Sequence, residues 1–238
     1  MDAAVLDILL EDGPLLAINK PPGIITQGAP RGVDGLVELT KRYLKEKYDK
    51  PGNVYLGIPH RLDRPVSGVV VFSRNSKCAA RLAEQFAQRQ VRKIYWACLE
   101  RPPAKETGSL VDWLYRIPDQ PRVEVSTEDT PGARRAELSY RVLARRRGRA
   151  LVEIELQTGR MHQIRIQFAS RGCPVVGDSQ YGARTTFAGA TSGERDGAIA
   201  LHARSLTLLH PVRYDEVTVV APPPPAWREL GFELVNGQ

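Results

Sequence analysis

The residues best suited to chemistry lie in one short stretch, His60 to Gly68, which reads HRLDRPVSG. Its single carboxylate, that of Asp63, stands between Arg61 and Arg64 and precedes an apolar run at 69–72 that predicts a buried strand. A nearby positive charge favours the ionised form of a carboxylate, which suits a nucleophile or an electrostatic stabiliser and does not suit a general acid. An isolated Arg-x-Asp-Arg fragment, by contrast, is more often an ion-pair loop on a protein surface.

The overall charge of the chain favours a nucleic-acid partner. The 238 residues include 34 Lys and Arg against 27 Asp and Glu, which gives a formal net charge of +7. Such a balance fits nucleic-acid binding, and it fits a merely basic soluble protein equally well. The N-terminal residues include acids where a secretory signal carries lysine or arginine, and the sequence contains no apolar run of membrane-spanning length. We therefore expect a cytoplasmic protein with no membrane partner.

The cysteines and histidines show no spacing typical of a metal site. The three cysteines are odd in number and far apart in the sequence, and the four histidines form no zinc pattern. We therefore expect a reduced, cytoplasmic setting and no bound metal. The residues concerned are Cys78, Cys98 and Cys173, with His60, His162, His202 and His210.

The spacing of apolar residues predicts an α+β fold with a mixed, largely antiparallel central sheet flanked by helices and loops. Strands and helices mix without a regular βαβ alternation, which argues against a parallel sheet. Helices are expected over 36–48, 77–90 and about 161–171. Strands are expected over 4–9, 14–19, 69–72, 92–99, 134–144, 149–157, 198–209 and 216–220, with short strands within 108–126 and a long surface loop over 183–197.

The second expected helix, at 77–90, has a recognisable start and an apolar face. Asn75 or Ser76 can cap its N-terminus with a side-chain oxygen. We expect the helix to pack on the sheet by a core face made of Ala79, Leu82, Ala83, Phe86 and Ala87.

Five groups of motifs, spread in one order over roughly residues 12–220, resemble those of the RluA-like pseudouridine synthases. The stretch around Asp63 is similar to the signature of that family, His-Arg-Leu-Asp-Arg followed by an acidic residue, Thr, Ser and Gly. The ordered set carries the resemblance more strongly than any one motif. The other matches are Asn19-Lys20-Pro21-Pro22-Gly23, Lys93-Ile94-Tyr95, Thr158-Gly159-Arg160-Met161-His162-Gln163-Ile164-Arg165, and the blocks Gly177-Asp178, Tyr181-Gly182 and Leu201-His202-Ala203.

The resemblance implies an enzyme that isomerises uridine to pseudouridine within ribosomal or transfer RNA and uses no cofactor. It implies that Asp63 attacks the target nucleotide or assists glycosidic cleavage, and that Tyr95 lies against the flipped base. Arg165 would pair with Asp63, and Arg61 would fill the gap left by the extruded nucleotide. Further expected substrate-binding residues are Arg64, Arg160 and His162, while Asp178 and Tyr181 would brace a turn near the site.

Several of these residues also fit a purely structural role. Tyr95 alone would more often be a strand residue packed on a core, and Arg165, which follows a core-facing isoleucine, could be a surface arginine of its helix. The basic turn near 145–149 could be a solvated hairpin tip or an RNA phosphate contact. In the second case Arg145 and Arg147 would contact RNA.

The expected organisation is a single catalytic domain over 1–238, with its core at about 12–220 and no separate S4-type RNA-binding domain. The catalytic domain would then find RNA through its own basic surface. We expect a monomer, because no long exposed apolar stripe remains after the elements are placed.

The sequence departs from the family pattern at three positions, which keeps rival functions open. Pro65 and Val66 replace an acidic residue and threonine, so the loop beside Asp63 loses a backbone donor and a hydroxyl. Gln167 stands where the family commonly has histidine. One rival is a catalytically weakened RNA-binding protein that retains the fold. Another is an unrelated hydrolase using Asp63, although a second carboxylate, a Ser-His pair or metal ligands are not found in a suitable setting.

Overall fold

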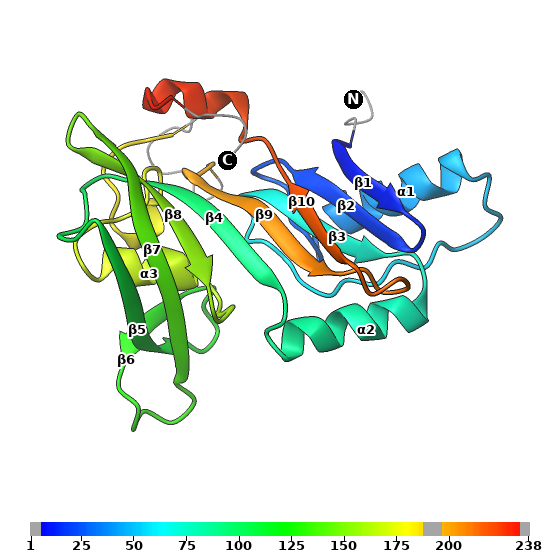
Figure 1. Ribbon diagram of the computed structural model, residues 1–238, viewed down its shortest axis with the longest axis horizontal. Helices are drawn as coiled ribbons and strands as arrows, with labels where there is room; N and C mark the ends of the chain where they lie inside the picture. Colours follow the sequence, from blue (N-terminus) through cyan, green and yellow to red (C-terminus); the bar gives the residue numbers. More distant parts are fainter. Residues whose placement is uncertain (1–5, 188–196, 234–238) are drawn as a thin grey trace. The chain divides into compact units, whose positions relative to one another are not determined.

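The computed structural model describes residues 6–187 and 197–233, and the chain forms two compact units (Figure 1). One unit comprises Met1–Val91 and Ala203–Pro223, and the other comprises Arg92–His202 and Pro224–Gln238. The organisation as a single catalytic domain stays a prediction.

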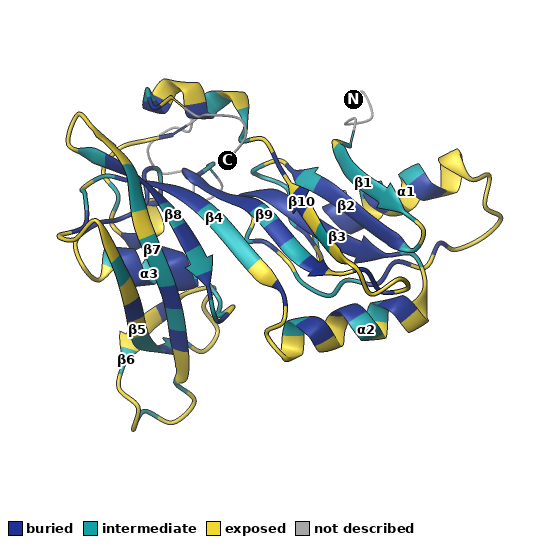
Figure 2. Cartoon of the chain, in the orientation of Figure 1, coloured by how far each residue is buried: buried dark blue, intermediate teal, exposed yellow. Residues whose placement is uncertain are grey.

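The first unit is built on antiparallel strands and two helices. Its strands follow the order β1-β2-β3-β9-β10, and the pairs β1–β2, β2–β3 and β9–β10 are antiparallel. Every residue of β3 is buried, so both faces of the sheet are covered at this strand (Figure 2). The bounds are β1 (Ile8–Asp12), β2 (Leu15–Lys20), β3 (Ser67–Ser73), β9 (Leu201–Leu209, in this unit from Ala203), β10 (Glu216–Val220), α1 (Leu36–Lys47) and α2 (Ser76–Ala87).

One face of this sheet packs on α2 through apolar side chains. Leu82 of α2 belongs to the same buried cluster as Val69 and Val71 of β3, and Leu206 and Leu208 of β9 complete it. Residues two apart along a strand point to the same face, which is why these alternate positions meet the helix. The burial of this cluster fixes the start of β3, and therefore the position of the loop that precedes it.

The start of α2 is confirmed, whereas its predicted core face is partly wrong. The side chain of Asn75 accepts a hydrogen bond of 2.8 Å from the backbone N–H of Cys78, which caps the helix. The buried positions are Cys78, Leu82 and Gln85, and the expected core residues Ala83 and Ala87 are exposed. The helix also ends at Ala87, before the predicted 90.

The buried amide of Gln85 explains the rotated face of α2. Its Nε2 donates to the carbonyl of Leu209, and its Oε1 accepts from the Leu209 N–H, each at 2.9 Å. A polar side chain can be buried when its donor and acceptor are both satisfied. The helix therefore turns Gln85 toward β9.

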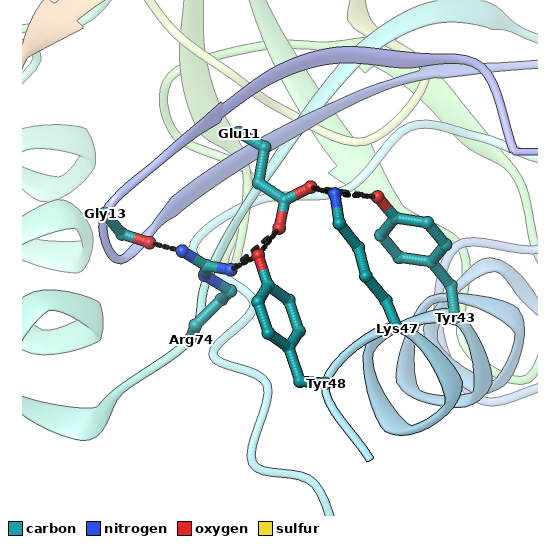
Figure 3. A network of polar contacts seen from close by, with 6 residues as sticks. All are labelled: Glu11, Gly13, Tyr43, Lys47, Tyr48 and Arg74. Atoms are coloured by element: carbon teal, nitrogen blue, oxygen red, sulfur yellow. Dashed lines mark hydrogen bonds and ion pairs between the residues drawn. The ribbon is translucent and has the colours of Figure 1, made fainter. Parts of the chain in front are cut away.

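A polar network around Glu11 ties α1 to the hairpin of β1 and β2 (Figure 3). The Glu11 carboxylate accepts hydrogen bonds from Tyr43 at 2.9 Å and Lys47 at 2.7 Å, both on α1, and from the hydroxyl of Tyr48. Arg74, which follows β3, donates to the same carboxylate at 2.8 Å. One carboxylate thus joins three segments of the unit.

The second unit is a twisted run of antiparallel strands with a short helix. The order is β4-β8-β7-β5-β6, and each neighbouring pair is antiparallel. Phe168 of α3 packs edge-on against Tyr140 of β7, with ring centroids 5.4 Å apart, which seats the helix on the sheet. The bounds are β4 (Arg92–Leu99), β5 (Thr107–Arg116), β6 (Val123–Ser126), β7 (Arg134–Arg146), β8 (Arg149–Leu156), α3 (Gln163–Ala169), η1 (Ser179–Tyr181) and η2 (Pro225–Leu230).

These elements confirm the α+β fold with a largely antiparallel sheet. The third helix is shorter than the predicted 161–171, because His162 adopts a left-handed φ of 51° and α3 begins only at Gln163. Strand β9 begins at Leu201 and not at 198. Most of the expected loop at 183–197, namely 188–196, and the first residues of the strand predicted at 4–9 lie outside the described residues. No helix within 6–187 and 197–233 is both long and apolar enough to span a membrane.

Candidate active site

The loop that carries Asp63 closes as a tight turn ahead of β3. The backbone N–H of Val66 donates to the carbonyl of Asp63 at 3.1 Å. The turn needs no hydrogen bond from the backbone nitrogen of residue 65, so a proline there loses no contact of the turn. Val66 is buried, with 2% exposure. Proline and valine at these positions are therefore compatible with an ordered loop, while Asp63 itself stays partly exposed.

A buried lysine, Lys20, forms hydrogen bonds that anchor this loop. Lys20, at the end of β2, is 0% exposed, and its ammonium donates to the carbonyls of Pro21 at 2.9 Å, Ile24 at 2.8 Å and Arg64 at 3.1 Å. Burial lowers the pKa of Lys20 from 10.5 to about 7, and the negative charge of Asp63 opposes that shift. The first unit therefore supplies a buried amine whose charged form interacts with the Asp63 carboxylate.

Two further pairs of hydrogen bonds attach the same loop to the segment after β2. Gly23 donates its N–H to the Arg64 carbonyl at 2.8 Å, and the Arg64 Nε donates to the Gly23 carbonyl at 3.0 Å. The hydroxyl of Thr26 donates to the Leu62 carbonyl at 2.8 Å and accepts from the Leu62 N–H at 3.2 Å. The residues on both sides of Asp63 are thus fixed by backbone contacts, and Arg64 has a structural contact besides its predicted RNA role.

The first two residues of the stretch differ, because His60 contacts the framework whereas Arg61 is exposed. His60 accepts a hydrogen bond of 3.0 Å from the Val71 N–H through Nε2 and stacks on Phe86, with ring centroids 4.7 Å apart. This contact anchors the loop to β3 and α2. Arg61 is exposed, as an RNA-contacting side chain requires.

In the second unit, Tyr95 lies on β4 opposite Ile154 of β8. Its burial is intermediate, whereas the following residues of β4, from Trp96 to Leu99, are buried. Tyr95 is therefore a partly buried strand residue, and its role against a flipped base stays a prediction. Part of Tyr95 remains exposed to solvent.

Arg165 of α3 is 4% exposed, so the interpretation as a surface arginine is wrong. Its Nε and Nη2 donate to the two carboxylate oxygens of Asp178, at 2.7 and 2.8 Å. Nη2 also donates to the side-chain oxygen of Gln180 at 2.8 Å, and the guanidinium carbon lies 5.0 Å from the centroid of the Tyr181 ring. Asp178 and Tyr181 thus contact Arg165 directly, a role that the sequence did not reveal.

His162 and Arg165 both contact Tyr181. Its Nδ1 lies 2.8 Å from the Tyr181 hydroxyl, which also accepts a hydrogen bond of 3.1 Å from the Val123 N–H. The left-handed backbone at His162 turns the chain into α3. The predicted substrate-binding residue is therefore also part of the framework around Arg165.

The motif from Thr158 to Gln163 is held on β7 by a ladder of polar contacts. The Thr158 hydroxyl donates to the Gln163 side-chain oxygen at 2.8 Å, and the Gln163 amide donates to the Glu137 carbonyl at 3.0 Å. The Nε of Arg160 donates to the Arg135 carbonyl at 3.0 Å. These contacts fix the turn from which Arg160 and His162 project.

The basic hairpin between β7 and β8 turns through Arg147 and Gly148, with φ of 51° and 76°. Arg145 forms an ion pair of 2.8 Å with Glu106, and Arg146 donates to the Gly231 carbonyl. Arg147 is exposed. The two predicted RNA contacts of this hairpin therefore differ, because Arg145 already neutralises a carboxylate.

Gln167, at the third departure from the family pattern, is fully buried on α3. Its Nε2 donates to Asp112 at 2.7 Å, and Asp112 also pairs with Arg171 through both oxygens, at 2.9 and 3.1 Å. Gln167 therefore helps to attach α3 to β5. This pair is separate from the Arg165 contacts.

The expected site residues are distributed over both units. Asp63, Arg61 and Arg64 belong to the first unit, and the second holds Tyr95, Arg160, His162 and Arg165 with Arg145 and Arg147. The pairing of Asp63 with Arg165 stays a prediction. All three cysteines are buried and free, and no group of three or more His, Cys, Asp or Glu suited to a metal occurs within 6–187 and 197–233.

Comparisons with known proteins give a consistent family. Residues 14–170 match the family model described as RNA pseudouridylate synthase. An uncharacterized RNA pseudouridine synthase of Zymomonas mobilis is 38% identical over 232 residues, covering 94% of this chain and 97% of its own length. The ribosomal large subunit pseudouridine synthase D of Xylella fastidiosa is 34% identical over 228 residues, covering 92% of this chain and 66% of its own length.

A solved structure agrees with the sequence relatives. Human RNA pseudouridylate synthase domain containing 4 superposes with a TM-score of 0.78 and 27% identity, over 97% of this chain and 95% of that one. These likenesses exclude an unrelated hydrolase. The family model spans more than half of the sequence, and a relative at 38% identity is covered almost end to end, so the chain belongs to the RNA pseudouridine synthase family of enzymes.

Proposed function

We propose that this protein isomerises specific uridines to pseudouridine in structured RNA, ribosomal or transfer RNA, with Asp63 as the nucleophile. The observation that carries the proposal is the fixed, partly exposed position of Asp63 beside buried Lys20. A carboxylate held in an ordered turn near a cation is preorganised to attack, because little orientation remains to be lost.

The reaction places simple demands on these side chains. The bond between C1′ and N1 breaks, the uracil turns, and C1′ joins C5; the proton leaves C5 and N1 gains one. No net redox change occurs and no group is added, so the proposal includes no cofactor and no metal. Asp63 bonds covalently to the sugar or the base as the glycosidic bond breaks, and this bond to Asp63 breaks again as the product forms, which restores the carboxylate. The base must first leave its stack, and Tyr95 offers it an aromatic face and assists removal of the C5 proton.

Arg165 completes the proposed catalytic group as the partner of Asp63. A guanidinium carries five N–H donors, so it can bind a second carboxylate besides that of Asp178. In the proposal Arg165 donates to Asp63 as well. A charge-assisted contact of this kind keeps a carboxylate ionised and oriented.

The surrounding basic residues recognise RNA in this proposal. Arg61 fills the space left by the extruded nucleotide, and Arg64, Arg160 and His162 contact the substrate near the site. Arg145 and Arg147 contact phosphates farther along the RNA. The protein acts as a cytoplasmic monomer and binds RNA through its own catalytic region.

A catalytically weakened RNA-binding protein is the second candidate. The observation in its favour is the replacement of the usual acidic residue and threonine by Pro65 and Val66. The ordered turn and the retained Asp63, Tyr95 and Arg165 support the enzyme instead.

Asp63→Asn separates the two candidates. We expect the variant to lose pseudouridine formation on unmodified ribosomal and transfer RNA transcripts and to keep its RNA affinity, because phosphate contacts dominate binding. The matched control is Asp34→Asn, which removes an exposed carboxylate paired with Arg42 in the same unit. Wild-type protein treated with a chelator should remain active on RNA whose folding has been verified. Substantial conversion by Asp63→Asn would overturn the assignment of the nucleophile, and an inactive wild type would favour the second candidate.

A further inference from the structure

We propose that Asp178 is a positioning residue that fixes the orientation of the Arg165 guanidinium, and that this orientation sets the rate of the chemical step. The inference rests on the proposed function, in which Arg165 acts on Asp63. Asp178 itself touches neither the RNA nor the nucleophile in this scheme. Its role is exerted entirely through Arg165.

The geometry of the pair determines the plane of the guanidinium. Nε and Nη2 of Arg165 face the two oxygens of Asp178 at 2.7 and 2.8 Å, so two parallel hydrogen bonds hold one edge of the fork. The side chains are 5% and 1% exposed. Water therefore competes little for either group, and rotation of the arginine would leave a buried carboxylate without its donors.

Two more contacts restrain the same group from other directions. The side-chain oxygen of Gln180 accepts from Nη2 at 2.8 Å, and the ring centroid of Tyr181 lies 5.0 Å from the guanidinium carbon. The Tyr181 hydroxyl is itself held by the Val123 N–H and by His162. Three residues of the segment 178–181 thus contact the same side chain.

The segment before Asp178 is anchored on the strand that carries Tyr95. The Val176 N–H donates to the Cys98 carbonyl of β4 at 2.9 Å, and the Val176 carbonyl accepts from Ala200 at 2.9 Å. Gly177 has a φ of 87°, and a Cβ there would lie 2.8 Å from the Ala198 carbonyl oxygen, so only glycine fits without a shift. Asp178 is therefore presented from a rigid support that also positions β4.

A buried guanidinium needs acceptors for its N–H donors, and the contacts with Asp178 and Gln180 supply three of them. Because these acceptors lie in fixed directions, they also determine the orientation of the Arg165 side chain. Orientation matters for the rate, since a displacement of about 1 Å in a catalytic group can cost about 100-fold.

The test compares Asp178→Asn with Asp112→Asn. The control removes the charge of another bidentate Asp–Arg pair in the same unit, that of Asp112 and Arg171. Single-turnover pseudouridine formation, RNA affinity and thermal unfolding are measured at a temperature where each variant is folded. For Asp178→Asn we expect a rate about 100-fold lower with an RNA Kd within twofold of wild type. For Asp112→Asn we expect both values to stay within twofold.

Each remaining outcome has a defined meaning. A folded Asp178→Asn with the wild-type rate would overturn the positioning role, and so would a loss explained entirely by weaker RNA binding. If Asp178→Asn does not fold, the deciding variant is Gln180→Ala, which removes one exposed acceptor of Arg165 and leaves the ion pair with Asp178. We expect a single-turnover rate about fivefold lower than wild type. An unchanged rate would overturn the inference. Asp63→Asn and Arg165→Ala run in the same assay. If either is fully active, the proposed function fails, whereas an active Asp178→Asn beside two inactive variants defeats this inference alone.

Discussion

The ammonium of Lys20 donates a hydrogen bond of 3.1 Å to the carbonyl oxygen of Arg64, the residue that follows Asp63. The same ammonium bonds the carbonyls of Pro21 and Ile24, so all three of its N–H donors have an acceptor. A neutral amine has only two such donors. The protonation of Lys20 is therefore coupled to the anchoring of the loop and to the charge beside Asp63.

We predict that this coupling appears in the pH dependence of stability. Burial lowers the pKa of Lys20 to about 7 in the folded protein, against 10.5 as its ordinary value. Between these values the unfolded chain binds one more proton at this site, so the contribution of Lys20 to the free energy of unfolding rises with pH from about 7 to 10.5. Below pH 7 both states are protonated, and the full cost of burying the charge is present.

Urea unfolding at a series of pH values measures this effect. Between pH 7 and 10.5, Lys20→Met should lower the slope of the free energy of unfolding against pH by the equivalent of about one bound proton. Lys45→Met, which replaces an exposed lysine, should leave this slope unchanged. Asp63→Asn should move the step to lower pH, because the charge of Asp63 raises the pKa of Lys20. Identical slopes for wild type and Lys20→Met would show that Lys20 does not titrate in this range.

Local features of the fold were predictable, and features that depend on distant partners were not. Asn75 was one of the two caps expected for α2, with Ser76, and it could be expected because its partner, Cys78, lies within the same helical turn. The core face of α2 was partly wrong because the partner of Gln85 is Leu209, 124 residues away. Nothing in the helix alone marks that glutamine as buried.

The candidate site shows the same division. Asp63 was singled out from its immediate neighbours, whereas the contact of Arg165 with Asp178 depends on how the chain returns after α3. The burial of Lys20 could have been predicted, because Leu16, Ile18 and Lys20 lie on the same face of β2. All three residues are buried. A lysine in that register would be expected to need buried acceptors.

We predict that Gly68→Ala is strongly destabilising. Gly68 has a φ of 117°, and a Cβ there would lie 2.3 Å from the carbonyl oxygen of Ala203 on β9. The backbones of β3 and β9 would have to separate, so we expect a loss of more than about 3 kcal/mol. Gly13→Ala is the control, because its φ of 52° is also positive but nothing lies within 4 Å of its Cβ; it should cost about 1–2 kcal/mol. Equal losses in chemical denaturation would mean that backbone strain, and not the contact with Ala203, requires the glycine.

The network around Glu11 (Figure 3) should stabilise the protein only above acid pH. Burial by itself would raise the pKa of Glu11, but hydrogen bonds from Lys47, Tyr48 and Tyr43 outweigh it and lower the pKa from 4.5 to about 2. The contribution is therefore complete above pH 4.5 and is lost as the pH falls toward 2.

Glu11→Gln tests this contribution. At pH 7 the variant should be less stable than wild type by about 1–2 kcal/mol, since the network is partly solvent-exposed and screened. The difference should shrink between pH 4.5 and 2 and respond to salt. Asp215→Asn, which removes an exposed partner of Arg213 in the same unit, is the control and should show little change at either pH. A destabilisation that stays constant with pH would point to lost packing and not to the charge.

The turn of the basic hairpin offers a test of RNA contact that does not disturb the fold. Arg147 and Gly148 both have positive φ, and Asn-Gly is the pair best suited to a two-residue turn of that kind. Arg147→Asn should therefore keep or slightly raise stability while it removes one positive charge. If Arg147 contacts a phosphate, the slope of log K against log salt should become shallower by about 0.7–0.9. Arg141→Asn also removes one charge, but from an arginine paired with Glu153 at 2.8 Å, so it controls for net charge and should change the slope less. Equal slopes for the two variants would mean that Arg147 acts only through the overall charge, and the hairpin would then be a solvated tip.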